Sequence, residues 1–204
     1  MYNAEYISPI GKLTMCSDGE ALVGLWLEGQ KYFGETCGDI GQKNQDLKIF
    51  QEVTGWLDEY FQGNQSEIGK LPLKPFGNEF RQTVWKILCE IPYGKTITYG
   101  DIAQKIARQR DISKMSTQAV GGAVGHNPIS IIIPCHRVVG KNGNLTGYAG
   151  GLNAKKFLLN LEHALYIILN YFITGSLKFC FRTFVMQYVP PKPPELLVLQ
   201  LLSI

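Results

Sequence analysis

The sequence predicts an α/β chain of the α+β kind, with a small N-terminal sheet-plus-helix domain followed by a mostly helical domain. Three observations carry this prediction. Residues 4–27 alternate apolar and polar side chains, residues 46–62 carry apolar side chains at helical spacing, and capping residues open three further helices after residue 77. A chain of 204 residues is long enough to bury a substantial core, in one domain or in two small ones.

The alternating pattern predicts a β-hairpin, with strands over residues 6–16 and 22–27 and a turn at residues 17–20. Residues 63–76 are polar and contain prolines, so we expect a linker there and domains at residues 1–76 and 77–164. The helix over residues 46–62 gathers its apolar side chains on one face, which we interpret as core rather than as a binding face: Ile49, Phe50, Val53, Trp56, Leu57, Tyr60 and Phe61.

Three short helices are expected in the second domain. Asn78 can cap the first, Thr98 and Asp101 fit a capping box at the start of the second, and Ser116 opens the third, which runs to residue 124. The second and third helices, separated by a turn, suggest a helix-turn-helix unit. The third helix carries mostly small side chains at residues 119–123, where Gly121 and Gly122 stand side by side. A glycine inside a helix costs about 1 kcal/mol relative to alanine, so these glycines need an explanation. Tight packing against another helix and close approach to DNA both explain such a helix.

Residues 129–133 are a β-branched apolar run that predicts a buried strand. Pro134 stops this strand, and the next side chains are the thiol of Cys135 and the imidazole of His136. A thiolate is a strong nucleophile at neutral pH, and a nearby imidazole can help to form it. Neighbours on an extended chain point to opposite sides, so adjacency alone does not bring the two groups into contact.

Charge is distributed unevenly along the chain. The net charge is +3, but residues 1–76 carry −5 (6 Lys and Arg against 11 Asp and Glu) and residues 77–164 carry +6 (11 against 5). This asymmetry favours a polyanionic partner for the second domain. The five cysteines show no CxxC spacing, which argues against a zinc ribbon or a disulfide scaffold. No secretory pattern is visible, so a reduced cytoplasmic compartment is expected.

The run Pro134-Cys135-His136-Arg137-Val138-Val139-Gly140 resembles the signature of the O6-alkylguanine-DNA alkyltransferases, a family of single-use DNA repair proteins. The resemblance is strong over residues 77–163, weaker over residues 1–76, and absent from residue 165 onward. Further motifs similar to those of the family follow one another in the same order, at residues 79–85, 91–100, 119–123, 127–128 and 147–152.

The resemblance implies a ribonuclease-H-like N-terminal domain and a winged-helix-like helix-turn-helix domain, whose bare helix enters the minor groove of double-stranded DNA. It implies irreversible transfer of an alkyl group from O6-alkylguanine, and also from O4-methylthymine, to Cys135 after the base is flipped out. No cofactor and no metal are expected. Some members hold an N-terminal zinc ion, but this half of the chain has no histidine. A monomer without membrane association is expected.

The resemblance also implies roles for individual residues. Cys135 is the nucleophile, His136 takes its proton through a water molecule, and Glu162 orients the imidazole. Asn127 joins the thiol network, and Tyr99 donates to the leaving guanine. Arg137 is expected to be a structural residue with a carboxylate partner. The expected base- and DNA-binding residues are Gln118, Ala119, Gly121, Gly122, Val138, Tyr148, Ala149 and Lys155.

Two residues depart from the family pattern. Gln118 stands where members often carry an arginine that fills the gap left by the flipped nucleotide, and Ala149 stands where many have serine. Residues 165–204 are an atypical apolar and proline-rich extension, and the last helix is expected to continue to about residue 172.

Two rival functions stay open. The first is a non-catalytic sensor that binds alkyl lesions, but such a protein would lack the reactive cysteine. The second is a cysteine hydrolase, which would need an oxyanion hole that the neighbouring motifs do not indicate.

Overall fold

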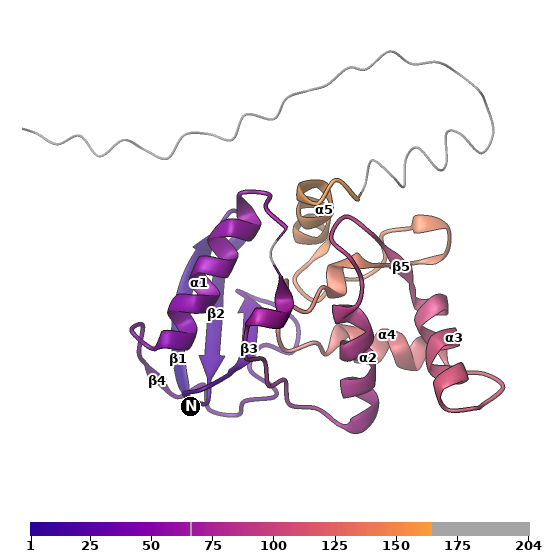
Figure 1. Cartoon of the computed structure of the whole chain (residues 1–204), viewed down its shortest axis with the longest axis horizontal. Coiled ribbons are helices and arrows are strands. Elements are labelled where there is room, and N and C mark those ends of the chain that lie inside the picture. The colour runs from indigo at the N-terminus through magenta and orange to yellow at the C-terminus, as the bar shows by residue number, and fades with distance from the viewer. Residues whose placement is uncertain (66, 165–204) are drawn as a thin grey trace, which may run out of the picture.

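The computed structural model describes residues 1–65 and 67–164. The N-terminal half is a four-stranded sheet of order β3-β2-β1-β4, partly covered by helix α1 (Lys48–Phe61) (Figure 1). Strands β1 (Tyr2–Ser8), β2 (Gly11–Ser17) and β3 (Leu22–Leu27) pair in antiparallel fashion, and β4 (Gln42–Lys43) pairs parallel to β1. The mixture of sheet and helices confirms the predicted α/β class.

The predicted first strand is wrong in one respect. Residues 6–16 are not one strand, because the chain reverses at Pro9 and Ile10 and pairs Ser8 with Gly11. Proline cannot donate to a ladder, and Gly11 takes a φ of 114° that favours glycine, so this segment turns instead of running straight. The hairpin from β2 to β3 forms as predicted, while β4 is too short to leave a periodic pattern.

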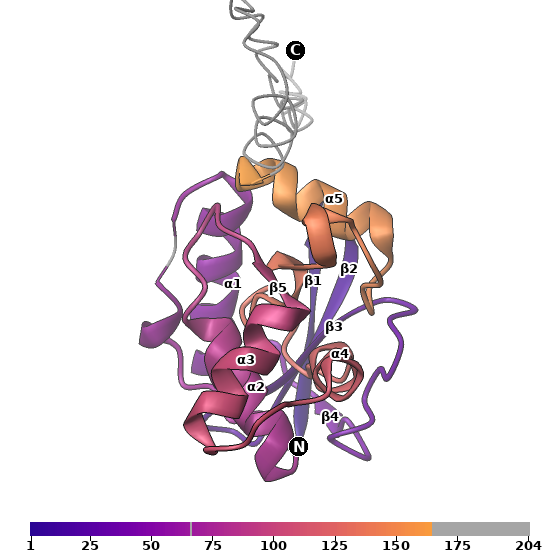
Figure 2. The same ribbon diagram turned by 90° about the vertical axis from the view of Figure 1, so that its right-hand side faces the viewer.

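The second half is helical, with α2 (Glu79–Cys89), α3 (Tyr99–Gln109), α4 (Thr117–Gly125) and α5 (Leu152–Leu161) (Figure 2). The three expected helix starts are confirmed. The Asn78 side chain accepts from the Arg81 N–H at 2.9 Å, and the Ser116 hydroxyl accepts from the Ala119 N–H at 3.2 Å. Thr98 and Asp101 form the reciprocal capping box at the start of α3. The turn between α3 and α4 gives the expected helix-turn-helix arrangement.

Residues 129–133 are buried as predicted, but they are a tight turn and not a strand. Only Ile129 pairs with the N-terminal sheet, through a single parallel bridge to Leu25 of β3. The Ile133 N–H then donates back to the Ile129 carbonyl at 3.0 Å, and Ile131 takes a φ of 70°. An apolar run shows that a segment is buried, whereas its direction depends on the hydrogen bonds that its surroundings offer.

One hydrophobic core joins the two halves. It includes Leu25 and Val53 from the sheet and α1, Val84 from α2, Ile129 from the turn and Leu158 from α5, all fully buried. Helix α5 lies across the junction in Figure 1. A small parallel pair, β5 (Ile97–Thr98) with β6 (Val138–Val139), ties the start of α3 to the segment after Cys135.

The expected continuation of the last helix is wrong at its first residues, because α5 ends at Leu161 and His163 takes a φ of 57°. The rest of that continuation to about residue 172 and the whole extension at 165–204 lie outside the described residues. Within residues 1–65 and 67–164, no helix is long and apolar enough to cross a membrane. The same residues contain no cluster of three or more His, Cys, Asp and Glu side chains that could hold a metal ion.

Candidate active site

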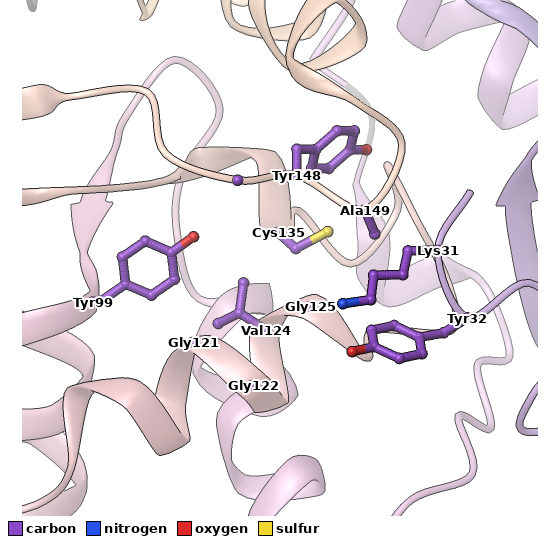
Figure 3. A pocket seen from close by; sticks show the side chains of 11 residues that line it. Lys31, Tyr32, Tyr99, Gly121, Gly122, Val124, Gly125, Cys135, Tyr148 and Ala149 are labelled. Carbon is purple, nitrogen blue, oxygen red and sulfur yellow. The ribbon is translucent and has the colours of Figure 1, made fainter. Parts of the chain in front are cut away.

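Cys135 lies at the edge of a pocket of about 330 Å³, between α4 and the loop at residues 147–149 (Figure 3). It opens a short 3-10 turn, Cys135–Arg137, directly after Pro134, and its side chain points into the pocket although the residue is only 3% exposed. The pocket is lined by Lys31, Tyr32, Tyr99, Gly121, Gly122, Val124, Gly125, Cys135, Gly147, Tyr148 and Ala149.

Asn127 connects the thiol to the turn at residues 129–133. Its side-chain amide donates to Cys135 Sγ at 3.1 Å, to the Ile133 carbonyl at 2.8 Å and to the Ile129 carbonyl at 3.2 Å. Its Oδ1 accepts from the Ile129 N–H at 3.1 Å. One buried amide therefore holds both the strained turn and the sulfur, which explains why this position needs an asparagine and not merely a turn former.

Burial raises the pKa of the Cys135 thiol above its usual value, while the Asn127 hydrogen bond and the positive charge of Lys155 act in the opposite direction. Burial dominates, so the resting sulfur is a thiol and requires a base. Burial also lowers the pKa of Lys155 to about 8. Lys155 Nζ donates to the Val138 carbonyl at 2.6 Å and to the Thr146 carbonyl at 2.9 Å, so α5 and the pocket loops are joined behind the cysteine.

Glu162 accepts hydrogen bonds from four groups. Its carboxylate receives Arg137 Nε at 2.8 Å and Nη2 at 3.0 Å, His136 Nε2 at 2.8 Å, the Tyr60 hydroxyl at 2.7 Å and the Gly94 N–H at 3.2 Å. Burial alone would raise the pKa of Glu162, but its hydrogen bonds from His136 and Arg137 and its ion pair with Arg137 outweigh burial and lower the pKa to about 2. The carboxylate is therefore ionised, and Arg137 is the buried structural cation expected from the sequence.

This network fixes the proton position on His136. Burial lowers the pKa of the imidazole below its usual value, despite the opposing effect of Glu162, so the ring is neutral at pH 7. The ionised carboxylate can only accept, so Nε2 must carry the ring hydrogen. Nδ1 is then a bare acceptor, buried and without a hydrogen-bond partner among the described residues. A neutral imidazole whose Nε2 donates to a carboxylate and whose Nδ1 lone pair is unoccupied is suited to act as a general base.

Helix α4 lines the pocket with a face that carries glycines and no large side chain. A Cβ added to Gly122 or Gly125 would meet nothing within 4 Å, and one added to Gly121 would only touch the Tyr99 ring at 3.9 Å. Tight helix packing therefore does not explain Gly121 and Gly122. They leave an open surface that another backbone can approach closely.

The expected site residues fall into three groups. Tyr99, Gly121, Gly122, Cys135, Tyr148 and Ala149 line the pocket. Asn127, His136, Val138, Lys155 and Glu162 lie buried behind it. Gln118 and Ala119 are exposed on α4 and do not line the pocket.

Sequence reasoning missed Tyr60, Lys31 and Tyr32, and it did not name as site residues Val124, Gly125 and Gly147, which also line the pocket. Tyr60 was assigned to the core, yet its hydroxyl reaches Glu162; nothing in an apolar helical pattern distinguishes such a tyrosine from its packing neighbours. Lys31 and Tyr32 come from a loop in the other half of the chain and carried no motif. Their position depends on long-range packing that local patterns do not report.

Nearly all of the described residues match one known protein family. Residues 1–75 match the ribonuclease-like domain of 6-O-methylguanine DNA methyltransferases, and residues 79–164 match the DNA binding domain of the same family. The methylated-DNA--protein-cysteine methyltransferase of Haemophilus influenzae is 44% identical over 167 residues, covering 82% of this chain and 89% of that protein. The protein of the same name from Methanosarcina acetivorans is 43% identical, covering 79% of this chain and 98% of the relative.

Solved structures of proteins from the same family resemble this chain. The crystal structure of the Mycobacterium tuberculosis protein in complex with DNA has a TM-score of 0.68 and 40% identity, covering 79% of this chain and 92% of that one. The O6-methylguanine DNA methyltransferase of Methanococcus jannaschii has a TM-score of 0.57 and 29% identity, covering 89% of this chain and all of that one. The chain that carries this buried Cys135 site therefore belongs to the methylated-DNA–protein-cysteine methyltransferase family.

Proposed function

We propose that this protein repairs alkylated DNA by moving the alkyl group of O6-methylguanine, and of O4-methylthymine, onto its own Cys135 in a single turnover. The observation that carries the proposal is the Cys135 thiol in a pocket of about 330 Å³, backed by a neutral His136 whose Nε2 is held by Glu162. The family relationship supports it, because the relatives are named for this transfer to cysteine.

The first step is formation of the thiolate. His136 Nδ1 is a buried acceptor without a partner among the described residues, and we assign it to take the Cys135 proton through a bridging water molecule. The Asn127 amide, 3.1 Å from Sγ, and the positive charge of Lys155 then stabilise the negative sulfur. Glu162 stabilises the imidazolium that results.

The second step is displacement at carbon. The bond between Sγ and the alkyl carbon forms as the bond from that carbon to O6 breaks, and the electron pair stays with the guanine. The leaving base gains a proton, for which we assign the Tyr99 hydroxyl at the start of α3, because it lines the same pocket. The imidazolium of His136 then releases the former Cys135 proton to water, and Tyr99 regains one from water, so the protons balance. Burial raises the pKa of Tyr99, which keeps this hydroxyl protonated and able to donate. The thioether product has no easy leaving group, so each molecule acts once.

The proposed partner is double-stranded DNA from which the damaged nucleotide is flipped out. The open face of α4 at Gly121 and Gly122 suits close approach to the minor groove, with Gln118 and Ala119 exposed on the same helix. A relative of known structure was solved with DNA. The Val138 carbonyl and the backbone amides near Tyr148 and Ala149 are assigned to read the base. We further propose that the protein acts as a cytoplasmic monomer, where a free thiol stays reduced.

The test is the intact mass of the protein after incubation with a duplex containing one O6-methylguanine. We expect a gain of one methyl group per molecule, located on Cys135 by peptide mapping, and a progress curve that stops at one equivalent. Cys135→Ala should bind the duplex without gaining mass. The matched control Cys89→Ala, which removes an exposed cysteine on α2, should gain the methyl group as the unaltered protein does.

Two results would overturn the proposal. Turnover beyond one equivalent would identify a hydrolase, and binding of the lesion by the unaltered protein without any mass gain would identify a sensor.

A further inference from the structure

One wall of the Cys135 pocket comes from the N-terminal half of the chain. Lys31 and Tyr32, in the loop after β3, line the pocket together with Ala149 and Gly125 (Figure 3). The Lys31 N–H donates to the Ala149 carbonyl at 3.1 Å, which ties this loop to the pocket loop at residues 147–149. The proposed reaction gives neither Lys31 nor Tyr32 a role.

Tyr32 is held firmly in its place. It takes a φ of 64°, a left-handed conformation that costs on the order of 1–3 kcal/mol for a residue other than glycine. Its ring stacks on His126 at the end of α4, with centroids 3.8 Å apart and planes 19° from parallel. His126 is itself fixed, because its Nδ1 lies 2.7 Å from the Gly122 carbonyl. A strained tyrosine on a fixed platform makes a rigid wall.

Lys31 gives this wall its charge. Its ammonium lies 4.7 Å from the centre of the Tyr32 ring, and it is the only charged side chain among the residues that line the described pocket. The rest of the lining is glycine, tyrosine, valine, alanine and the cysteine itself. A negative group that entered the pocket would therefore meet one cation and no carboxylate.

The direction of Sγ places a substrate relative to this wall. In Figure 3, Sγ points away from Tyr99 and toward the side of the pocket where Ala149, Lys31 and Tyr32 lie. With the guanine ring beside Tyr99, the alkyl carbon lies in line between O6 and Sγ, so any further atoms of the substituent project sideways from that line. They enter the part of the pocket around Sγ, which Ala149, Lys31 and Tyr32 border. The pocket, at about 330 Å³, is at the small end of ligand sites, so little room remains there beyond the base.

We propose that Lys31 and Tyr32 form the substituent end of this pocket and set the range of O6-alkyl groups that the protein removes. Tyr32 excludes bulky apolar groups, and Lys31 favours a small anionic group such as carboxymethyl over a neutral one. This inference rests on the proposed alkyl transfer and deepens it.

The test uses three duplexes of one sequence that carry O6-methyl-, O6-benzyl- or O6-carboxymethylguanine, with single-turnover rates measured for each. Tyr32→Ala should raise the ratio of benzyl to methyl rate by about tenfold, the scale of one change in a pocket wall. Lys31→Gln should lower the ratio of carboxymethyl to methyl rate by about threefold, the scale of a partly solvated ion pair. Ratios within one variant cancel its effects on folding and on DNA affinity.

Matched controls change an aromatic residue and a lysine that do not line the pocket. Phe33→Ala alters the neighbouring ring, which packs on Trp26, and Lys48→Gln removes an exposed lysine on α1. Both should leave the two ratios unchanged. If Tyr32→Ala and Lys31→Gln scaled all three rates equally, the wall would act on DNA binding and the inference would be overturned. Failure of the unaltered protein to transfer even a methyl group would instead overturn the proposed function, and this inference with it.

Discussion

Arg137 and Glu162 form a buried ion pair with two parallel hydrogen bonds, Nε to Oε2 at 2.8 Å and Nη2 to Oε1 at 3.0 Å. The same carboxylate holds His136 Nε2 at 2.8 Å. The cation keeps Glu162 ionised, and the ionised carboxylate keeps the imidazole in the tautomer that leaves Nδ1 bare. The ion pair therefore links the stability of the fold to the reactivity of the site.

The Glu162→Gln variant tests this link. It leaves the Arg137 charge buried without a counterion, so the free energy of unfolding at pH 7 should fall by about 3–5 kcal/mol. The difference in the free energy of unfolding between the variant and the unaltered protein should become smaller as pH falls from 4.5 toward 2. The pKa of Glu162 is lowered to about 2, so in this range protonation removes the negative charge that the variant lacks at every pH. Urea unfolding over this pH range measures both effects.

The control is Glu52→Gln, at an exposed i,i+4 pair with Lys48, which should lower the free energy of unfolding by less than about 1 kcal/mol. A difference between Glu162→Gln and the unaltered protein that did not change with pH would contradict the assignment.

Tyr60→Phe removes one donor from Glu162 and keeps the ring that stacks on Trp56. A hydrogen bond to a charged group contributes about 1.5–3 kcal/mol, so the free energy of unfolding should fall by that amount. Glu162 loses a donor and interacts more strongly with His136, so the acid side of the pH–rate profile should move to higher pH. Tyr6→Phe, which removes a solvent-exposed bond to Asp58, should cost less stability and leave the pH–rate profile unmoved. A loss of stability with an unmoved profile would make Tyr60 a packing residue alone.

The pH dependence of alkyl transfer should report His136. Its neutral form is the base, and burial lowers its pKa, so the single-turnover rate on saturating duplex should hold below pH 6.5 before it falls. His163→Asn, which replaces an exposed histidine after α5, should leave the profile unchanged. An acid limb at or above pH 6.5 would show that a solvated group controls the rate.

Gln118→Arg should speed transfer from duplex DNA severalfold, where about 1.4 kcal/mol corresponds to tenfold. Gln118 is exposed on α4 and does not line the pocket, so a longer cationic side chain there can fill the gap in the base stack and help to keep the nucleotide extruded. Reaction with free O6-benzylguanine, which needs no flipping, should hardly change. The test is the transfer rate of the variant and of the unaltered protein, each measured on duplex DNA and on the free base. An equal change in rate on the two substrates would mean that Gln118 acts on the pocket itself.

Local signals in the sequence were sufficient for the starts of α2, α3 and α4. Asn78, Thr98 and Ser116 cap their helices as predicted, because a cap involves only the next three residues. The turn at residues 129–133 could not be predicted in this way. Its conformation depends on Asn127 and on the bridge to Leu25, and an isoleucine at a φ of 70° has no signature in composition or periodicity.

The same division holds for the site. A recognisable motif surrounds Cys135 and His136, and their family resemblance indicated Glu162 and Asn127 as partners. Tyr60 comes from α1 and Lys31 from the loop after β3, and each reaches the site only when the halves pack together. Tyr60 has the sequence pattern of a core residue and Lys31 that of a surface residue, so only the folded arrangement distinguishes them from others of their kind.

We expect the bridge between Leu25 and Ile129 to form late during folding. It joins positions separated by half of the chain, and contacts of such long sequence separation form slowly, because a large loop must close before they do. The turn at residues 129–133, which directly precedes Pro134 and Cys135, depends on this bridge, so the helices and the first hairpin can form well before the reactive centre does. A partly synthesised or partly folded chain would therefore carry an ordinary thiol, and only the completed molecule would hold an alkyl acceptor.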